Sequence, residues 1–288
     1  MAEIAASTVM KLRKMSGQGM MDCKHALAEA DGDLDKAMEI LRKKGLATLA
    51  KRAERETTEG IVVSKTSDDG RTVALATLCC ETDFVAKSDD FVAAAQVLAD
   101  CTLLCKEDSG TQNLLETEYK GKKFKERLTE LVGKTGEKTE VGDYARFTLT
   151  GPGLLTVYIH FNKKIGTMIE VAAGAEAVAK SDAFKQAIAD VAMHITAINP
   201  LALDKNGISP QLIASERAIY AEQVKGKPAN IVDKIVDGKL NKFFAEKCLL
   251  AQAFVKDDSK TVAQVVDEAA KKAGGKAQIK RFVRFSVG

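Results

Sequence analysis

The chain has 288 residues, of which 45% are hydrophobic and 29% are charged, a balance typical of a globular protein with a sizeable core. Its 43 basic and 40 acidic residues nearly cancel, which argues against a strongly basic nucleic-acid-binding face, so we expect no direct nucleic-acid partner. No apolar run reaches the ~18 residues of a membrane span, and the first residues resemble neither a secretory signal nor a transit peptide. We therefore expect a cytoplasmic protein without a membrane partner.

Residues 1–45 predict three short helices. Apolar residues recur at helical spacing in three runs, which are separated by SGQG at 16–19 and DGD at 31–33. Gly45 is expected to stand at the C′ position after the third helix. The charged segment 46–59 should extend that helix and fade into a linker.

The next segments predict a hairpin followed by helices. The runs GIVVSKT and RTVALATLCC, joined by SDDG at 67–70, have the composition of two strands and a turn. A helix should follow the second strand, with Phe91 and Leu98 on its apolar face. Another helix is expected from Tyr119 to Val132, and YARFTLT at 144–150 should return to strand.

An internal repeat organises the rest of the chain. The pentapeptide VAKSD occurs at 85–89 and again at 178–182, an offset of 93 residues. At this offset IVVSKT falls on LLTVYI and VALATLCC falls on GTMIEVAA, so that strand falls on strand. The core is therefore predicted to be duplicated, with two similar α+β halves.

The second half carries an insertion and then closes the fold. Ser209-Pro210 is a typical helix start, and an apolar stripe on a return helix follows KGKP at 225–228. A helical hairpin is therefore expected at about 208–246. Its stripe has two open interpretations, packing on its own chain or on another. A helix at 260–273, ended by Gly274 and Gly275, and a final strand near FVRFSV complete the predicted fold.

Metal and cofactor sites are not predicted. Cys79 and Cys80 should point to opposite faces of a strand, and all the cysteines are expected to be buried, reduced thiols. The three histidines do not have the spacing of zinc ligands. The cysteines are Cys23, Cys79, Cys80, Cys101, Cys105 and Cys248, and the histidines are His25, His160 and His194.

No group of residues in the sequence predicts catalysis, so we do not expect an enzyme. GQGMMDCK lacks the spacing of a P-loop, and neither G-x-S-x-G nor H-E-x-x-H occurs. The candidate anchors for a partner are instead apolar. Met20 and Met21 begin a helix, and Phe84 stands beside Asp83 in a short polar turn. In the repeat, Phe84 corresponds to Ala177, so the shared architecture does not require a phenyl ring there.

Three segments resemble the elongation factor Ts family of guanine-nucleotide exchange factors. They are KLRKMSGQGMMDCKHAL at 11–27, CETDFVAK at 80–87 and GKPANIVDKIVDGKLNKFF at 226–244. The resemblance spans nearly the whole chain in order. It implies a translation factor that binds the GTPase elongation factor Tu in its GDP form and promotes GDP release, with no cofactor of its own.

The resemblance also implies domains. Residues 1–55 would form a UBA-like N-terminal domain, residues 56–150 the first core subdomain, and residues 151–288 the second. The hairpin at 208–246 would be a coiled-coil or dimerisation module, which leaves open a homodimer or a 2:2 complex.

The resemblance further implies partner-binding residues in three groups. Those that displace Mg²⁺ from the GTPase would be Thr82, Asp83, Phe84 and Val85. Those of the N-terminal domain would be Leu12, Arg13, Met20 and Met21, and weaker candidates in the second half would be His160, Met193 and His194.

The sequence departs from the family pattern at several points. Cys79 stands where the family usually has Asn, and Met15 where it usually has Thr. The region 106–142 is diverged, and contacts of the C-terminal tail of some members are not carried over to this chain.

Two other functional classes remain as alternatives. A peptide-binding adaptor would use the three-helix module alone and would leave the repeat and TDFVAK unexplained. An RNA-associated translation protein would use the basic segments KKGLATLAKR and KKAGGKAQIKR.

Overall fold

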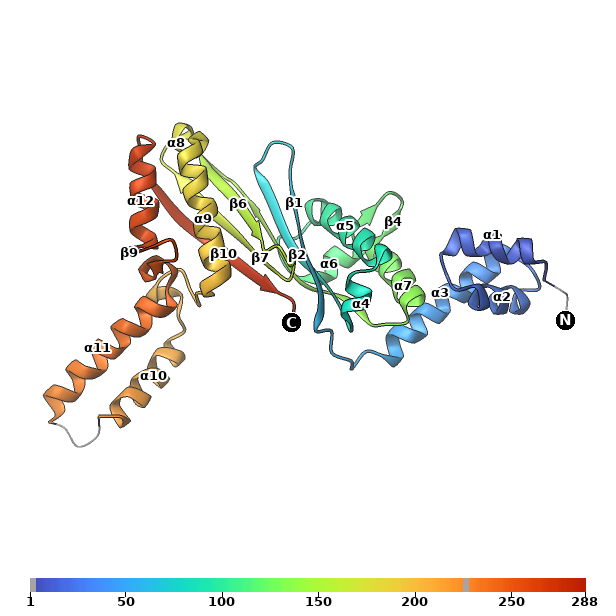
Figure 1. The fold of residues 1–288 in the computed structure, drawn as a ribbon, viewed down its shortest axis with the longest axis horizontal. Coiled ribbons are helices and arrows are strands. Elements are labelled where there is room, and N and C mark those ends of the chain that lie inside the picture. Colours follow the sequence, from blue (N-terminus) through green and yellow to red (C-terminus); the bar gives the residue numbers. More distant parts are fainter. Residues whose placement is uncertain (1–3, 225–227) are drawn as a thin grey trace.

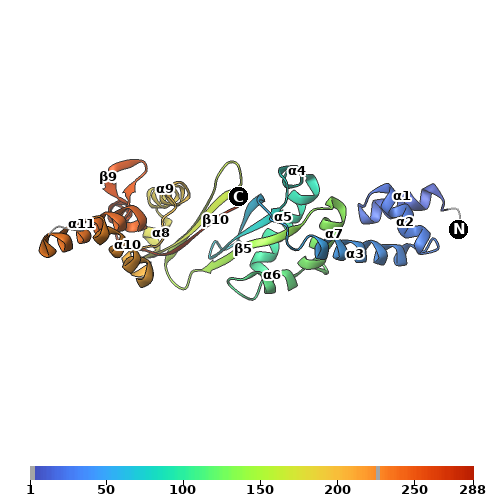
Figure 2. The same cartoon turned by 90° about the horizontal axis from the view of Figure 1, so that it is seen from below.

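The computed structural model describes residues 4–224 and 228–288 and has an elongated shape (Figure 1). Three N-terminal helices lie at one end of the molecule and a two-helix hairpin lies at the other. Two β-sheets with their helices lie between these ends, as the view from below also shows (Figure 2). The predicted α+β fold, with three helices followed by mixed helix and sheet, is confirmed.

The chain forms its elements in three successive groups. The N-terminal helices are α1 (Ala6–Ser16), α2 (Met20–Glu29) and α3 (Leu34–Lys51). The first half of the core consists of β1 (Glu59–Thr66), β2 (Thr72–Cys80), α4 (Asp83–Ala86), α5 (Asp89–Leu104), α6 (Thr111–Glu116), β3 (Glu118–Tyr119), β4 (Lys122–Lys123), α7 (Phe124–Thr135) and β5 (Thr139–Thr148). The second half consists of β6 (Gly153–Ile159), β7 (Ile165–Ala173), α8 (Glu176–Lys180), α9 (Asp182–Ile198), a 3-10 turn (Lys205–Gly207), α10 (Pro210–Glu222), α11 (Ala229–Lys247), a second 3-10 turn (Leu249–Ala251), β8 (Ala253–Phe254), β9 (Asp257–Thr261), α12 (Val262–Lys272) and β10 (Ala277–Ser286).

The predicted repeat is present in the fold. Each half contains a three-stranded antiparallel sheet, in the order β1-β2-β5 and β6-β7-β10. Moving β2 by 93 residues gives the bounds of β7, and α5 falls on α9 in the same way. Even the caps correspond, because Ser88 accepts a hydrogen bond from the amide of Phe91 and Ser181 accepts one from the amide of Phe184, both at 3.4 Å.

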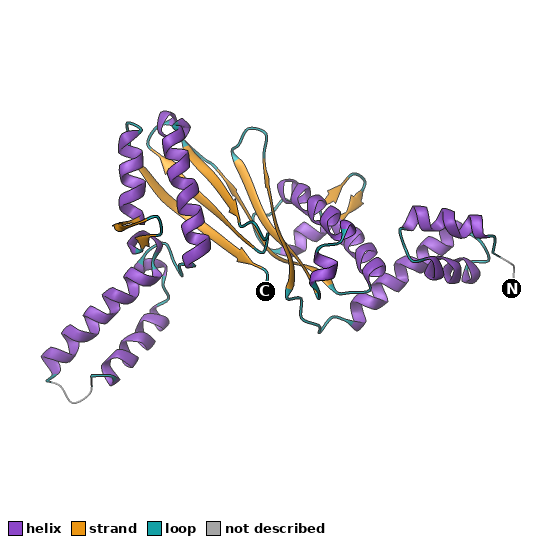
Figure 3. Ribbon diagram, in the orientation of Figure 1, coloured by secondary structure: helices purple, strands orange, loops and turns teal. Residues whose placement is uncertain are grey.

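The two sheets face each other and carry helices on their outer faces (Figure 3). Side chains of both sheets form one apolar layer between them, including Leu75 of β2 and Met168 of β7. Helices α5 and α7 cover the outer face of the first sheet, and α9 and α12 cover that of the second. Cys79 lies in the layer between the sheets and Cys80 lies under the helices, so the prediction of opposite faces is confirmed.

The N-terminal helices have their own small core, and their third helix extends beyond residue 45, as predicted for the segment 46–59. Val9, Leu12 and Leu27 are buried at the centre of the three helices. Helix α3 continues through Gly45 to Lys51, so the prediction that Gly45 ends the helix is wrong. Gly45 is needed instead for a close approach, since a Cβ there would lie 2.6 Å from the carbonyl oxygen of Thr129 in α7.

The helix predicted from Tyr119 starts later than expected. Tyr119 belongs to a two-residue strand paired with β4, and α7 begins at Phe124. Lys120 and Gly121 both have positive φ, at 51° and 75°, which makes the tight turn between these strands. The remaining helix pattern, with Leu128 and Val132 buried, is as predicted.

The inserted hairpin consists of α10 and α11. Ser209 caps α10 by accepting a hydrogen bond from the Leu212 amide at 3.3 Å, with Pro210 in the first turn, as expected. Val236 and Leu240 are buried between the two helices. Residues 225–227 of the predicted KGKP turn lie outside the described residues.

The state of the cysteines and the hydropathy of the helices agree with what the sequence predicts. All six cysteines are free and buried, as predicted. Among the helices that the structure describes, none is both long and apolar enough to cross a membrane.

Candidate functional site

The turn after β2 presents a phenyl ring to solvent. Thr82 ends the extended backbone and caps the four-residue helix α4, with its hydroxyl accepting a hydrogen bond from the Val85 amide at 3.4 Å. Val85 and Ala86 turn inward and pack on the core of the first half. Phe84 points the other way and is 83% exposed. An exposed phenyl ring on an ordered turn is suited to insertion into a partner.

Asp83 is an ion-pair partner in this turn. Lys87, one helical turn later, donates a hydrogen bond to its carboxylate at 2.6 Å. This hydrogen bond, more than the charge of Lys87 or of the more distant Lys164, lowers the pKa of Asp83. Asp83 is therefore a carboxylate at neutral pH and has the properties of a fixed charge, not of a general base.

Two carboxylates hold the base of the turn. The Thr82 amide and hydroxyl donate hydrogen bonds to Glu137 at 3.1 Å and 2.8 Å. Glu81, only 10% exposed, accepts hydrogen bonds from Arg52 and from the Lys138 amide. The sequence alone did not single out Arg52, Glu81, Glu137 or Lys138, because their contacts join segments about 30 to 60 positions apart in the chain.

The N-terminal candidates divide between surface and core. Met20 and Met21 are 43% and 59% exposed, and Arg13 is also exposed. Leu12 is fully buried in the core of the three helices, so it supports this surface from beneath. Met10 is 62% exposed and was not predicted, although it lies one helical turn before Arg13 on α1.

The candidates of the second half also lie in different places, one in a surface turn and one inside the core. His160 is half-buried in the turn after β6, where its Nδ1 lies 3.3 Å from the Tyr158 hydroxyl. The ring of Phe161, 87% exposed, lies 4.3 Å from the His160 ring between centroids. Phe161 was not predicted. The available signal was a large aromatic next to Asn and Lys, between the segments LLTVYI and GTMIEVAA that the repeat predicts to be strands.

His194 lies inside the second half. Its ring is fully buried and accepts a hydrogen bond from the Val255 amide at Nδ1, 3.2 Å away. Nε2 therefore carries the proton and donates to Gln252 at 3.0 Å. Burial lowers the pKa of His194, against the opposing effect of Gln252. In this structure His194 offers no surface to a partner, and Met193 is only partly exposed.

The turn after β6 and the turn of α4 lie on the same side of the core. The Val62 amide of β1 donates to the Lys163 carbonyl at 2.7 Å, which attaches the turn after β6 to the first half. Lys164 then donates to Glu59 at 2.8 Å, and its charge also acts on Asp83. The N-terminal candidates are separate, since α1 and α2 lie beyond α7 from α4, at the N-terminal end of the molecule (Figure 1).

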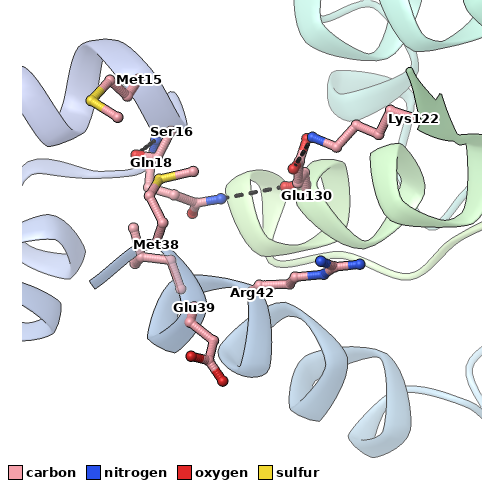
Figure 4. A pocket seen from close by; sticks show the side chains of 9 residues that line it. Met15, Ser16, Gln18, Met38, Glu39, Arg42, Lys122 and Glu130 are labelled. Carbon is pink, nitrogen blue, oxygen red and sulfur yellow. Dashed lines mark hydrogen bonds and ion pairs between the residues drawn. The ribbon is translucent and has the colours of Figure 1, made fainter. Parts of the chain in front are cut away.

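A crevice of about 360 Å³ separates the N-terminal helices from α7 (Figure 4). The Gln18 side-chain amide spans it and reaches the backbone of the last turns of α7. Arg42 of α3 forms an ion pair with Glu126 of α7 at 2.8 Å. These polar contacts attach the N-terminal helices to the first half of the core.

The basic segment KKGLATLAKR at 43–52 is mostly paired with carboxylates. Lys43 pairs with Glu39 at 2.9 Å, Lys44 pairs with Asp22, and Arg52 is held by Glu81. Paired side chains of this kind form a solvated helix surface and do not favour the RNA-binding alternative.

Comparison with known proteins identifies one family. The family model described as Elongation factor TS matches residues 81–288. The Elongation factor Ts of a Nitratiruptor species is 42% identical over 287 residues, covering 99% of this chain and 93% of that protein. That of Chloroherpeton thalassium is 38% identical over 293 residues, covering 100% and 99%. The chain therefore belongs to the elongation factor Ts family, whose members are non-catalytic nucleotide exchange factors of elongation factor Tu in translation elongation.

Proposed function

We propose that this chain binds the GDP form of elongation factor Tu and promotes GDP release by inserting Phe84 beside the nucleotide site, which displaces Mg²⁺. The observation that carries the proposal is the exposure of Phe84, 83%, on a turn whose neighbours are pinned to the core. The corresponding residue of the second half is Ala177. In this turn Thr82 caps the helix, Asp83 supplies a negative charge, and Val85 packs on the core.

Exchange of this kind requires that the factor and GDP weaken each other's binding to the GTPase, and it requires no catalytic step by the factor. If the factor weakens GDP binding to the GTPase, GDP weakens binding of the factor by the same free energy. A thousandfold acceleration of release needs about 4 kcal/mol off the barrier. One buried phenyl ring contributes about 1.5–3 kcal/mol by area, so other surfaces must hold the complex together.

Two surfaces are proposed to supply that holding energy. The first is the N-terminal surface of Arg13, Met20 and Met21 with Leu12 beneath it, which we propose to dock on the nucleotide-binding domain of the GTPase. Methionine side chains adapt to irregular partner surfaces. The second lies on the second half of the core around His160, with Phe161 beside it. Because His194 is fully buried, it does not add to this second surface, whereas Met193, partly exposed like His160, stays a proposed contact.

The domains and the assembly follow from the same proposal. Residues 1–55 would act as a UBA-like domain, and residues 56–150 and 151–288 as the two core subdomains. The hairpin is proposed to associate with a second copy, giving a homodimer or a 2:2 complex, because Ile219 and Ile231 are 48% and 43% exposed on it. We place this function in the cytoplasm, where translation elongation occurs.

The Mg²⁺ step can be tested separately from binding. Removal of Mg²⁺ with a chelator should accelerate GDP release from elongation factor Tu alone, and it should reduce the difference between the wild-type factor and Phe84→Ala. If this difference is the same with and without Mg²⁺, Phe84 acts by another route and the displacement step is wrong.

A further inference from the structure

The base of the α4 turn is held by a partly buried ion pair with the end of helix α3. Arg52, which directly follows α3, donates from one nitrogen to both carboxylate oxygens of Glu81, at 2.7 Å and 2.8 Å. The Lys138 amide donates to the same carboxylate at 2.6 Å. The side chains of Arg52 and Glu81 are 31% and 10% exposed. Charge-assisted hydrogen bonds of this length and burial fix the geometry of the groups that they join.

The neighbouring residues form a matching contact in the opposite direction. Glu137 accepts hydrogen bonds from the amide and hydroxyl of Thr82, while Glu81 accepts one from the amide of Lys138. The pairs 81–82 and 137–138 therefore exchange hydrogen bonds through their two carboxylates. This exchange fixes the backbone on which α4 begins, just before Phe84.

The second half of the core provides an internal comparison. Gly174 and Ala175 stand where the first half has Glu81 and Thr82. The corner is closed there by a backbone hydrogen bond from Gly174 to the Lys276 carbonyl at 2.8 Å, and Ala175 does not cap α8. Among the residues that the structure describes, no side chain bonds to Gly174 or Ala175. The half with Ala177 therefore folds without side-chain hydrogen bonds to these two residues, so the shared architecture does not require them.

We propose that Arg52 and Glu81 are positioning residues that hold the α4 turn so that Phe84 meets the partner in one preformed orientation. This inference rests on the proposed function of Phe84. Helix α4 has only four residues and cannot order itself, since a helix nucleus is unfavourable in isolation. A side chain that is already ordered before binding loses less entropy on binding. A preformed orientation of Phe84 should therefore speed the release of GDP.

The contact also connects the N-terminal helices with the turn. Helix α3 ends at Lys51, and Arg52 lies between it and Glu81. Movement of α3 relative to α7 therefore acts on the residue that holds the base of the α4 turn. Docking of the N-terminal surface and orientation of Phe84 are thus mechanically joined, mainly through Arg52. Arg55 adds a longer and more exposed contact to Glu81, at 3.3 Å.

The test is a double-mutant cycle on the rate of fluorescent GDP release from elongation factor Tu, measured at saturating factor by stopped flow. Arg52→Ala should slow release by roughly fivefold or more in the wild-type background. In the Phe84→Ala background it should change the rate by less than about twofold, because the residue that it positions is gone. Arg52→Lys, which keeps the charge, should restore part of the rate.

Arg281→Ala is the matched control. Arg281 forms an ion pair with Glu170 at 2.6 Å, and Glu170 is 13% exposed, but this pair lies in the second sheet away from α4. Its loss should leave the release rate unchanged. Hydrogen exchange of the free protein supplies a second measurement, which should show faster exchange in residues 82–87 for Arg52→Ala and Glu81→Gln, with the rest of β2 unchanged.

The outcomes separate this inference from the proposed function. If Phe84→Ala slows release and Arg52→Ala slows it equally in both backgrounds, Phe84 keeps its role and the positioning inference is wrong. An unchanged rate for Arg52→Ala, or unchanged exchange in residues 82–87, also overturns the inference. If Phe84→Ala itself has no effect, the proposed function of Phe84 fails first.

Discussion

Gly45 of α3 and Gly133 of α7 face each other where the two helices cross. A Cβ on Gly133 would lie 3.6 Å from the Cα of Gly45, and a Cβ on Gly45 would lie 2.6 Å from the Thr129 carbonyl oxygen. Gly45 therefore allows an approach of the helix backbones that any Cβ at position 45 would prevent, whereas a Cβ on Gly133 would meet Gly45 only in van der Waals contact. This crossing sets how the N-terminal helices stand on the core, and hence the spacing between the N-terminal surface and Phe84.

Gly45→Ala should destabilise the protein by about 1–2 kcal/mol. The methyl group overpacks the crossing, which costs about 1–3 kcal/mol, and the higher helix propensity of Ala recovers less than about 1 kcal/mol. Gly238→Ala is the control, because Gly238 lies exposed in α11 with nothing near its Cβ position. That change should stabilise by about 0.5–1 kcal/mol. Thermal unfolding measures both, and a stabilising Gly45→Ala would contradict the close crossing.

His194 should make the fold sensitive to mild acid. Burial lowers its folded-state pKa below the ordinary value of 6.5. Its contribution to stability is therefore complete above pH 6.5 and is lost as the pH falls from 6.5 toward the folded pKa, because only the unfolded chain then takes up the proton. Melting temperatures from pH 8 to 5.5 should fall more steeply for the wild type than for His194→Gln. Equal slopes would show that His194 does not titrate on unfolding.

Phe84 and Phe161 should differ in kinetic effect although both rings are over 80% exposed. Phe161→Ala should weaken the complex with elongation factor Tu by roughly 1–3 kcal/mol, since it removes a buried aromatic contact. It should leave the release rate at saturating factor unchanged, because Phe161 is not proposed to reach the nucleotide site. Titration of the release rate against factor concentration separates the two constants, and a lower maximal rate for Phe161→Ala would contradict this assignment.

The hairpin should control self-association. Ile219 and Ile231 are about half exposed, so Ile219→Glu and Ile231→Glu should leave the melting temperature almost unchanged. Both should shift the protein toward monomer in sedimentation equilibrium if the hairpin is the contact between copies. Leu240→Ala, which removes a buried contact between α10 and α11, should lower the melting temperature instead. A wild-type protein that is monomeric at all concentrations would rule out the dimer.

Local patterns predicted the elements, and the repeat predicted their arrangement. The offset of 93 residues at VAKSD places β2 on β7 and α5 on α9, because a duplicated chain keeps its hydrophobic periods and caps. Phe84 could be singled out for the same reason, since its counterpart is Ala177. Glycine was misread at one point, because a glycine near a helix end has the same sequence appearance as one that permits a close crossing, as Gly45 does.

The contacts that pin the turn could not be predicted. The pairing of Glu81 with Arg52 and of Glu137 with Thr82 depends on how α3 and α7 meet the end of β2. No local period encodes this meeting. His194 could have been placed inside, because it follows buried Val191 by three residues on the same face of α9.

The most direct measurement is the rate of fluorescent GDP release from elongation factor Tu with the wild type and with Phe84→Ala, together with the affinity of each for the nucleotide-free GTPase. We predict that the wild type accelerates release and that Phe84→Ala slows the maximal rate by roughly tenfold or more, while complex formation through the other two surfaces largely survives. An equal maximal rate for the two proteins, at matched occupancy of the complex, would contradict the proposed role of Phe84.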